Sequence, residues 1–151
     1  MIYAREVRPI QSPEIFANPD LIAEYAQESS IPEIGEIDPQ PLMYAAMEQT
    51  GILQCIGAFE WNRLVGFANV LCSVLPHYGK KVATIESIFV ARASRPGGIG
   101  LKLMEAAESH AKASGCTAIL YSAPTAGSLE RLLSAKRKHY KRTNAIFCRS
   151  L

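Results

Sequence analysis

The most informative segment of the chain reads Ile88-Phe-Val-Ala-Arg-Ala-Ser-Arg95-Pro-Gly-Gly98-Ile-Gly100-Leu-Lys-Leu-Met104. An apolar, β-branched strand pattern passes through a glycine loop into a helix pattern with apolar residues at Ile99, Leu103, Ala107 and Ala111. Glycines let backbone N–H groups turn inward around an anion, and the start of a helix adds unpaired donors and the positive end of its dipole. The segment therefore predicts a phosphate site, to which Arg95 adds a charge-assisted contact.

Two common phosphate-binding motifs do not fit this loop. The dinucleotide fingerprint G-x-G-x-x-G/A requires a small residue where Leu103 stands, and the P-loop requires Lys after its last glycine, where this chain has Leu101. On spacing alone, a glycine-rich turn that caps a helix is the simpler interpretation.

The rest of the pattern predicts a mixed α/β fold. Ile2–Val7 reads as a strand, Ser12–Ser30 as one or two helices opened by Ser12 and Pro13, and Leu42–Thr50 as a further helix. Three antiparallel strands are expected next, at residues 52–60, 64–71 and 82–90, with Trp61-Asn62-Arg63 as a hairpin turn. The remaining expected elements are the helix Ile99–Ser114, a buried strand Thr117–Tyr121, a helix Ser128–Lys138 with Leu129, Leu132 and Leu133 inward, and a last strand Tyr140–Arg149.

Composition restricts the class of protein. The 151 residues are 48% hydrophobic and 20% charged, which predicts one folded domain over residues 1–151. The net charge of +2 does not argue for a nucleic-acid partner, and the absence of a signal-like N-terminus or an apolar span predicts a cytoplasmic protein with no membrane partner. Four cysteines and three histidines are scattered without a metal-binding spacing, so we predict no metal site.

Arg95, Gly98 and Gly100, with Ile99 between the glycines, resemble the R/Q-x-x-G-x-G/A signature of the GNAT superfamily of N-acetyltransferases. The resemblance extends to the order of elements. It implies a central, mostly antiparallel mixed sheet flanked by helices on both faces, with two parallel strands that splay apart where acetyl-coenzyme A binds. One departure is Pro96 directly after the arginine, where the family usually has Gly; proline removes one N–H donor from the loop.

The resemblance implies a set of residues for the cofactor. Residues 95–101 would hold the pyrophosphate, and the backbone of Phe89 and Val90 would pair with the pantetheine arm. Ser128 matches a position that often contacts the arm, although a helix N-cap is the simpler role for it. The full set is Phe89, Val90, Arg95, Pro96, Gly97, Gly98, Ile99, Gly100, Leu101 and Ser128.

Glu86 is the candidate general base. It resembles the glutamate base of the histone-acetylating branch of the family, and a protonated amine must lose a proton before its nitrogen can attack a thioester. An even spacing from Val90 predicts that both side chains share one face of the strand, and the N–H of Val90, where the family's strand bulges, would meet the oxyanion. An exposed strand residue or salt-bridge partner is the alternative role of Glu86.

The customary tyrosine acid of the family is missing, because Ala135 aligns with its position. Tyr121 and Tyr140 are the substitute candidates for protonating the thiolate, with packing as their alternative role. The basic run of residues 136–142 reads as a solvated helix end or as a contact with the 3′-phosphate of the cofactor.

The sequence thus predicts acetyl transfer from acetyl-coenzyme A to a primary amine of a small molecule or peptide, by direct attack in a ternary complex. No cysteine has a recognisable nucleophile setting, and Glu28, Glu33, Glu36 and Asp38 hint at a cationic acceptor. Family members often pair, so a homodimer is possible. Two alternatives stay open: a non-catalytic acyl-coenzyme-A-binding module, and an unrelated α/β domain with a fortuitous loop.

Overall fold

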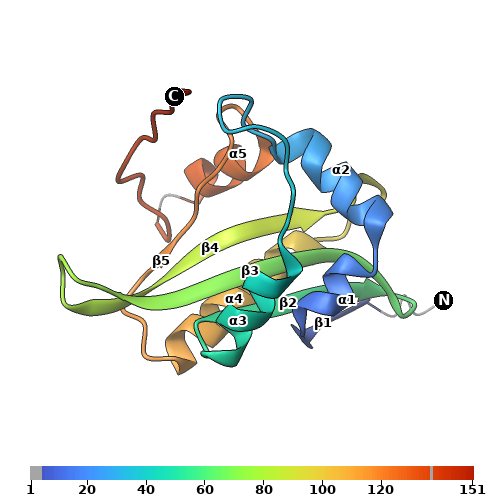
Figure 1. Cartoon of the computed structure of the whole chain (residues 1–151), viewed down its shortest axis with the longest axis horizontal. Coiled ribbons are helices and arrows are strands. Elements are labelled where there is room, and N and C mark those ends of the chain that lie inside the picture. The colour runs from blue at the N-terminus through green and yellow to red at the C-terminus, as the bar shows by residue number, and fades with distance from the viewer. Residues whose placement is uncertain (1–4, 137) are drawn as a thin grey trace.

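The computed structural model describes residues 5–136 and 138–151, and its ribbon is shown in Figure 1. In chain order, the elements are β1 (Arg5–Ile10), α1 (Ser12–Phe16), α2 (Pro19–Ser29), α3 (Pro41–Gln49), β2 (Leu53–Glu60), β3 (Arg63–Leu75), β4 (Lys80–Val90), a 3-10 turn (Arg92–Ser94), α4 (Ile99–Ala113), β5 (Ile119–Leu120) and α5 (Ser128–Ala135). No helix among these residues is long and apolar enough to cross a bilayer.

The five strands form one sheet in sequence order. Neighbouring strands run antiparallel from β1 to β4, and β5 pairs with β4 in parallel. The β2–β3 hairpin closes through Trp61 and Asn62, whose φ angles of 50° and 63° suit the two-residue turn that matches the twist of the strands. The predicted mixed, mostly antiparallel sheet is confirmed.

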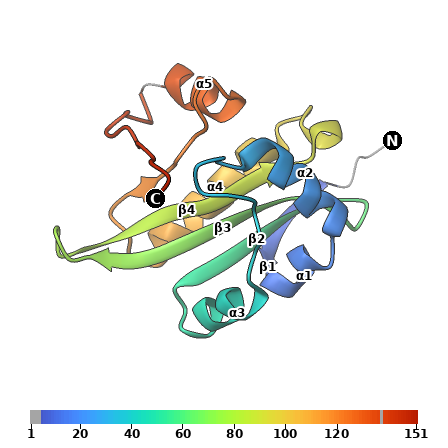
Figure 2. The ribbon, with the colours of Figure 1, turned by 45° about the horizontal axis from the view of Figure 1, so that its top comes forward.

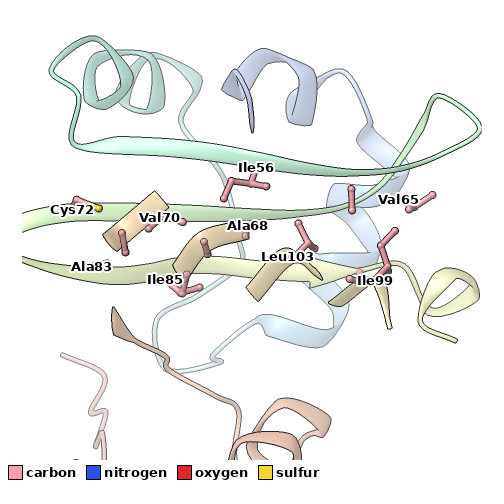
Figure 3. Packing of buried hydrophobic residues seen from close by; sticks show 13 residues of the cluster. Ile56, Val65, Ala68, Val70, Cys72, Ala83, Ile85, Ile99 and Leu103 are labelled. Carbon is pink, nitrogen blue, oxygen red and sulfur yellow. The ribbon is translucent and has the colours of Figure 1, made fainter. Parts of the chain in front are cut away.

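Helices cover both faces of the sheet (Figures 1 and 2). On one face α4 packs Ile99, Leu103 and Ala107 against Ala68 and other apolar residues of the strands, and Figure 3 shows part of this core. On the other face Ile15 of α1 and Leu21 of α2 join a second cluster with Phe67 and Phe89. Each face therefore carries its own apolar layer, one covered by α4 and the other by α1, α2 and α3.

The start and end of α4 follow from two glycines. Gly98 is left-handed, with φ of 79°, at the residue before the helix, and Gly115, with φ of 80°, comes directly after it. Both conformations are accessible to glycine at little cost. The predicted helix Ile99–Ser114 is therefore confirmed to within one residue.

The last predicted strand, Tyr140–Arg149, is wrong. No residue from 141 to 151 belongs to a helix or strand, and every one of them is exposed. A strand there would need a sheet edge to pair with, but β5 is only two residues long. Ser150 Oγ instead donates to the carbonyl of Glu33, in the segment between α2 and α3, at 3.0 Å.

Smaller corrections concern other ends of elements. The expected first strand begins outside the described residues and continues to Ile10, and the expected strand Thr117–Tyr121 shrinks to β5. In α5 the residues Leu129, Leu132 and Leu133 are half-buried, and the helix buries no side chain fully. It lies beyond the β4 edge of the sheet in both views (Figures 1 and 2), so it has little apolar surface to cover.

Candidate functional site

The loop before α4 presents a row of free backbone donors. Gly97 and Gly98 adopt φ angles of 100° and 79°, which turn the chain sharply into the helix. Among the hydrogen bonds of the described residues, none uses the N–H groups of residues 97–101; the first one bonded is that of Lys102, which donates to the Gly98 carbonyl at 3.2 Å. These five consecutive amides at the positive end of α4 fit a polyanion.

The guanidinium of Arg95 is held by the protein beside this loop. Its Nε donates to the Val90 carbonyl at 2.9 Å, and its Nη2 pairs with Glu28 of α2. The Arg95 side chain is 37% exposed, so the remaining donor side of the fork stays accessible. The hydrogen bond from Arg95 is the main reason why the pKa of Glu28 lies below its ordinary value, with Arg92 adding to the effect.

Strands β4 and β5 separate six residues before the end of β4. Their pairing ends at Thr84 and Leu120, so no strand covers this side of β4 beyond that pair. Ala91 N donates to the Val65 carbonyl of β3, and in an antiparallel ladder alternate residues face alternate sides. The N–H and C=O groups of Val90 and Ile88 therefore point to the open edge, whereas those of Phe89 face β3. The backbone available to a cofactor on this edge is therefore that of Val90 and Ile88, and not that of Phe89 as the sequence had led us to expect.

Three apolar side chains of the predicted cofactor set contribute little surface of their own. Ile99 is fully buried in the α4 core, and Phe89 and Val90 are 5% and 8% exposed. What these residues can offer a cofactor is backbone. Pro96, Gly97, Gly98 and Leu101 are exposed.

Glu86 lies at a β-bulge in the middle of β4. Asn69 of β3 pairs with Ser87, while the next residue, Val70, pairs with Ile85, so Glu86 has no partner in the ladder. Ile85 and Val90 both belong to the α4 core, but Glu86 bonds to Tyr44 of α3 on the opposite face. The prediction that Glu86 shares the face of Val90 is wrong, because the bulge inserts an extra residue and shifts the alternation. The strand bulges at Glu86 and not at Val90.

The carboxylate of Glu86 accepts two short hydrogen bonds. Tyr44 Oη donates to Oε1 at 2.8 Å, and Ser87 Oγ donates to Oε2 at 2.7 Å. Burial raises the pKa of Tyr44 and of Tyr25, and the charge of Glu86 raises both further. Both phenols are therefore neutral donors at physiological pH.

The two tyrosines proposed as proton donors share a different carboxylate. Tyr121 Oη and Tyr140 Oη both donate to Glu108 Oε1 of α4, at 3.0 Å and 2.5 Å, and their rings meet edge to face. Burial and Glu108 raise the pKa of Tyr121, and the same causes raise that of Tyr140 to about 12. Tyr121 follows the carboxyl end of β5, directly where the parallel pair opens.

The predicted cap at Ser128 is shifted by one residue. Gly127 is the N-cap of α5, no side chain caps this helix, and Ser128 is its exposed first residue. Of the basic run after the helix, residue 137 lies outside the described residues, and Arg142 forms an ion pair with Glu130. This pairing satisfies the charge of Arg142 within the protein.

The face of the sheet that holds Glu86 is covered by a segment without cations. From Pro9 to Asn62 the chain contains no Lys, Arg or His. Two acids of this segment, Glu24 and Glu28, bind the backbone and side chain of Arg92 next to the loop. The acidic residues of the segment are Glu14, Asp20, Glu24, Glu28, Glu33, Glu36, Asp38, Glu48 and Glu60. Their field favours a cationic ligand on this face.

Sequence reasoning did not find Tyr44, Tyr25 or Asn69 as neighbours of Glu86. They come from α3, α2 and β3, and only the folded sheet brings them together. The acids Glu28, Glu33, Glu36 and Asp38 already hinted at a cationic acceptor, and the stretch free of cations around them is a further sequence signal for this side. No group of three or more His, Cys, Asp or Glu side chains among the described residues is placed to hold a metal ion.

A comparison with known protein families and solved structures is consistent with the loop before α4 and with the mixed sheet. The model of the acetyltransferase (GNAT) family matches residues 19–130. The chain belongs to this family. No curated protein sequence matches the GNAT chain at a significant level.

Solved structures of GNAT acetyltransferases share its fold. An aminoglycoside acetyltransferase from an uncultured soil metagenomic sample superposes with a TM-score of 0.73 at 19% identity, covering 95% of each chain. The ribosomal-protein-alanine N-acetyltransferase of Brucella melitensis biovar Abortus gives 0.69 at 18%, covering 95% of this chain and 96% of that one. An aminoglycoside N-acetyltransferase solved in complex with CoA gives 0.72 at 14%, covering 97% and 94%. At these identities the likeness establishes the fold.

Proposed function

We propose that the protein transfers an acetyl group from acetyl-coenzyme A to a primary amine by direct attack in a ternary complex. The observation that carries the proposal is the row of unbonded N–H groups at residues 97–101, at the start of a 15-residue helix and beside Arg95. When bound, acetyl-coenzyme A supplies the activated acetyl group as a thioester.

The residues that would hold the cofactor lie along one path. The amides of the loop and the accessible side of Arg95 fit the diphosphate. The open edge of β4 offers the N–H and C=O of Ile88 and the N–H of Val90 to a chain that carries amides, because Arg95 already occupies the Val90 carbonyl. Ser128, exposed at the start of α5, is the proposed additional contact.

Glu86 would receive the proton of the acceptor ammonium. A carboxylate that accepts hydrogen bonds from Tyr44 and Ser87 is held in one orientation, and it still has lone pairs for a third donor. Tyr121 and Tyr140 are the proposed sources of a proton for the leaving sulfur. Their hydroxyl groups must turn from Glu108 for this step.

The acceptor is proposed to be cationic, in a small molecule or a peptide. The cation-free segment Pro9–Asn62 supports this class, as do structural neighbours described as an aminoglycoside acetyltransferase bound to sisomicin and as a ribosomal-protein-alanine N-acetyltransferase. Binding of an amino acid with a free carboxylate is disfavoured beside Glu86 and Glu48.

Calorimetry and a thiol-release assay test the proposal. Coenzyme A is titrated into the protein, and acetyl-coenzyme A turnover is followed with an aminoglycoside, a polyamine, free lysine and a peptide with N-terminal alanine. We expect binding, and turnover with at least one polyamine or amino sugar. Glu86→Gln should lower kcat by about 10²-fold or more with an unchanged Kd for coenzyme A, while Glu6→Gln, on exposed β1, is the matched control.

A non-catalytic acyl-coenzyme-A-binding module is the second candidate. It is favoured by Ala135 at the position of the usual acid and by the engagement of both substitute tyrosines with Glu108. Binding of coenzyme A without turnover of any amine would support this module, and absence of binding would reject both functions.

A homodimer is the remaining proposal on assembly. Ile146 and Phe147 near the C-terminus are 78% and 93% exposed, and apolar side chains of this size are costly to leave in water. Light scattering at micromolar concentration distinguishes a homodimer from a monomer.

A further inference from the structure

The bulge at Glu86 places two consecutive polar side chains on the same face of β4. In a regular strand, Glu86 and Ser87 would point to opposite faces. Here both reach the face covered by α1, α2 and α3, where Ser87 is 7% exposed and contacts Asn69 of β3, which is 3% exposed. Two buried polar side chains in an otherwise apolar layer are costly unless their hydrogen bonds compensate.

The hydrogen bonds of this group have a fixed direction. An ionised carboxylate accepts only, so the Ser87 hydroxyl donates to Glu86 Oε2 at 2.7 Å. Its oxygen is then free to accept from Asn69 Nδ2, which lies 2.9 Å away. Asn69 Nδ2 also makes a long hydrogen bond of 3.5 Å to Glu86 Oε2, and the reverse orientation of the amide would place its oxygen against the carboxylate instead. The chain of donors thus runs from Asn69 through Ser87 to Glu86.

The side-chain oxygen of Asn69 indicates that this residue does not serve stability alone. Its Oδ1 is buried and has no hydrogen-bond partner in the described part of the chain. A buried acceptor without a partner costs ~1–3 kcal/mol. An apolar side chain of similar shape would avoid that cost, so the contribution of Asn69 is the bond to Ser87.

We propose that Ser87 and Asn69 are positioning residues for Glu86, which hold its carboxylate in one orientation toward the acceptor amine. Ser87 donates directly, and Asn69 acts through Ser87 by fixing the direction of its hydroxyl. This inference rests on the proposed role of Glu86 as the base in acetyl transfer.

Few other groups titrate near Glu86 at neutral pH. Those that face it are Tyr25 of α2, Tyr44 of α3 and Cys55 of β2. Burial is the largest cause of a raised pKa for each of the three, and each is neutral at pH 7. Glu48 of α3 lies next to Cys55, and its carboxylate is held by the backbone and hydroxyl of Ser12. A change in the acidic limb of the pH profile of kcat/KM on substitution of Ser87 or Asn69 therefore does not come from these three groups.

The test compares that acidic limb in several variants. A hydrogen bond donated to a carboxylate lowers its pKa, so Ser87→Ala should move the limb to higher pH by about one unit. Asn69→Leu should move it in the same direction by less. In Asn69→Asp the new carboxylate accepts from Ser87 and repels Glu86, so the shift should exceed that of Ser87→Ala. Ser87→Thr should restore the wild-type profile, and Ser73→Ala, at an exposed position on β3, is the control.

A second measurement does not depend on turnover. The carboxyl carbon of Glu86, followed by NMR in protein labelled with ¹³C-glutamate, should titrate at higher pH in Ser87→Ala and in Asn69→Leu than in the wild type. If the wild type acetylates no amine but these shifts occur, acetyl transfer is rejected and the positioning of Glu86 stands. If Glu86 titrates at the same pH in folded Ser87→Ala as in the wild type, the positioning role is overturned.

Discussion

Within the loop before α4, residues 95–101, Gly97 is the residue whose substitution is most sharply constrained by the structure. Its φ of 100° is rarely adopted by residues with a side chain, and a Cβ built there would lie 1.9 Å from Nη1 of Arg5. That guanidinium donates to the Pro96 carbonyl at 2.7 Å and pairs with Glu60 at 3.0 Å. Gly97→Ala must therefore strain the backbone and displace Arg5 together.

The size of the effect follows from these two costs. A residue other than glycine at this φ costs ~1–3 kcal/mol, and loss of the charge-assisted bond to Pro96 adds ~1.5–3 kcal/mol. We expect Gly97→Ala to lower the free energy of unfolding by ~2.5–6 kcal/mol. Gly98→Ala is the matched control in the same loop: its φ is 79°, but no atom lies within 4 Å of its added Cβ, so the expected loss is ~1–2 kcal/mol.

Urea unfolding of a double-mutant cycle isolates the contact. If the clash with Arg5 matters, Gly97→Ala should cost less in an Arg5→Ala background, by the energy of the displaced guanidinium. Calorimetry with coenzyme A should show weaker binding for Gly97→Ala, because its loop amides must shift. Equal losses of stability for Gly97→Ala in both backgrounds would refute the packing argument.

Three further perturbations address the groups around the loop and the tyrosines. Arg95→Ala should weaken coenzyme A binding about tenfold or more, measured by calorimetry, and Arg95→Lys should recover part of it; an unchanged Kd would contradict the role. Arg95 and Arg92 lower the pKa of Glu28 from 4.5, so its stabilisation is present above pH 4.5 and is lost as the pH falls through the lower native value. In urea unfolding, Glu28→Gln should be less stable than wild type at pH 7, and the difference should shrink as the pH is lowered below 4.5. Tyr140, with its pKa raised to about 12, stays protonated, so kcat should show no alkaline loss below pH ~10. If kcat is unchanged in both Tyr140→Phe and Tyr121→Phe, neither tyrosine is the proton donor to the leaving sulfur.

The sequence predicted the elements whose signals are local. The helix from Ile99 is marked by its own apolar period and by glycines at both ends, and the β2–β3 hairpin by its turn. The strand predicted at Tyr140–Arg149 has no strand edge to pair with, because β5 is only two residues long. Pairing is a long-range property, and no local pattern reports it.

The candidate site divides in the same way. The loop at residues 95–101 is contiguous, so its motif could be read directly. The surroundings of Glu86 could not, because a one-residue bulge reverses the face of every side chain on one side of it. For this reason the even spacing from Val90 predicted the wrong face of the strand for Glu86. Asn69 and Tyr44 meet Glu86 only once the register of β3 and the position of α3 are set.

Helix α2 connects the two halves of the site. At its C-terminal end, Glu28 binds the side chains of Arg92 and Arg95, so the helix is fixed to the loop that would hold the diphosphate. One turn earlier, the ring of Tyr25 packs on Phe67 and Phe89, and its hydroxyl lies in the field of Glu86. A ligand that pulls Arg95 away from Glu28 therefore acts on the same helix that walls the acceptor side. The bulge of β4 and the loop before α4 therefore both contact α2, in addition to being joined by the end of β4.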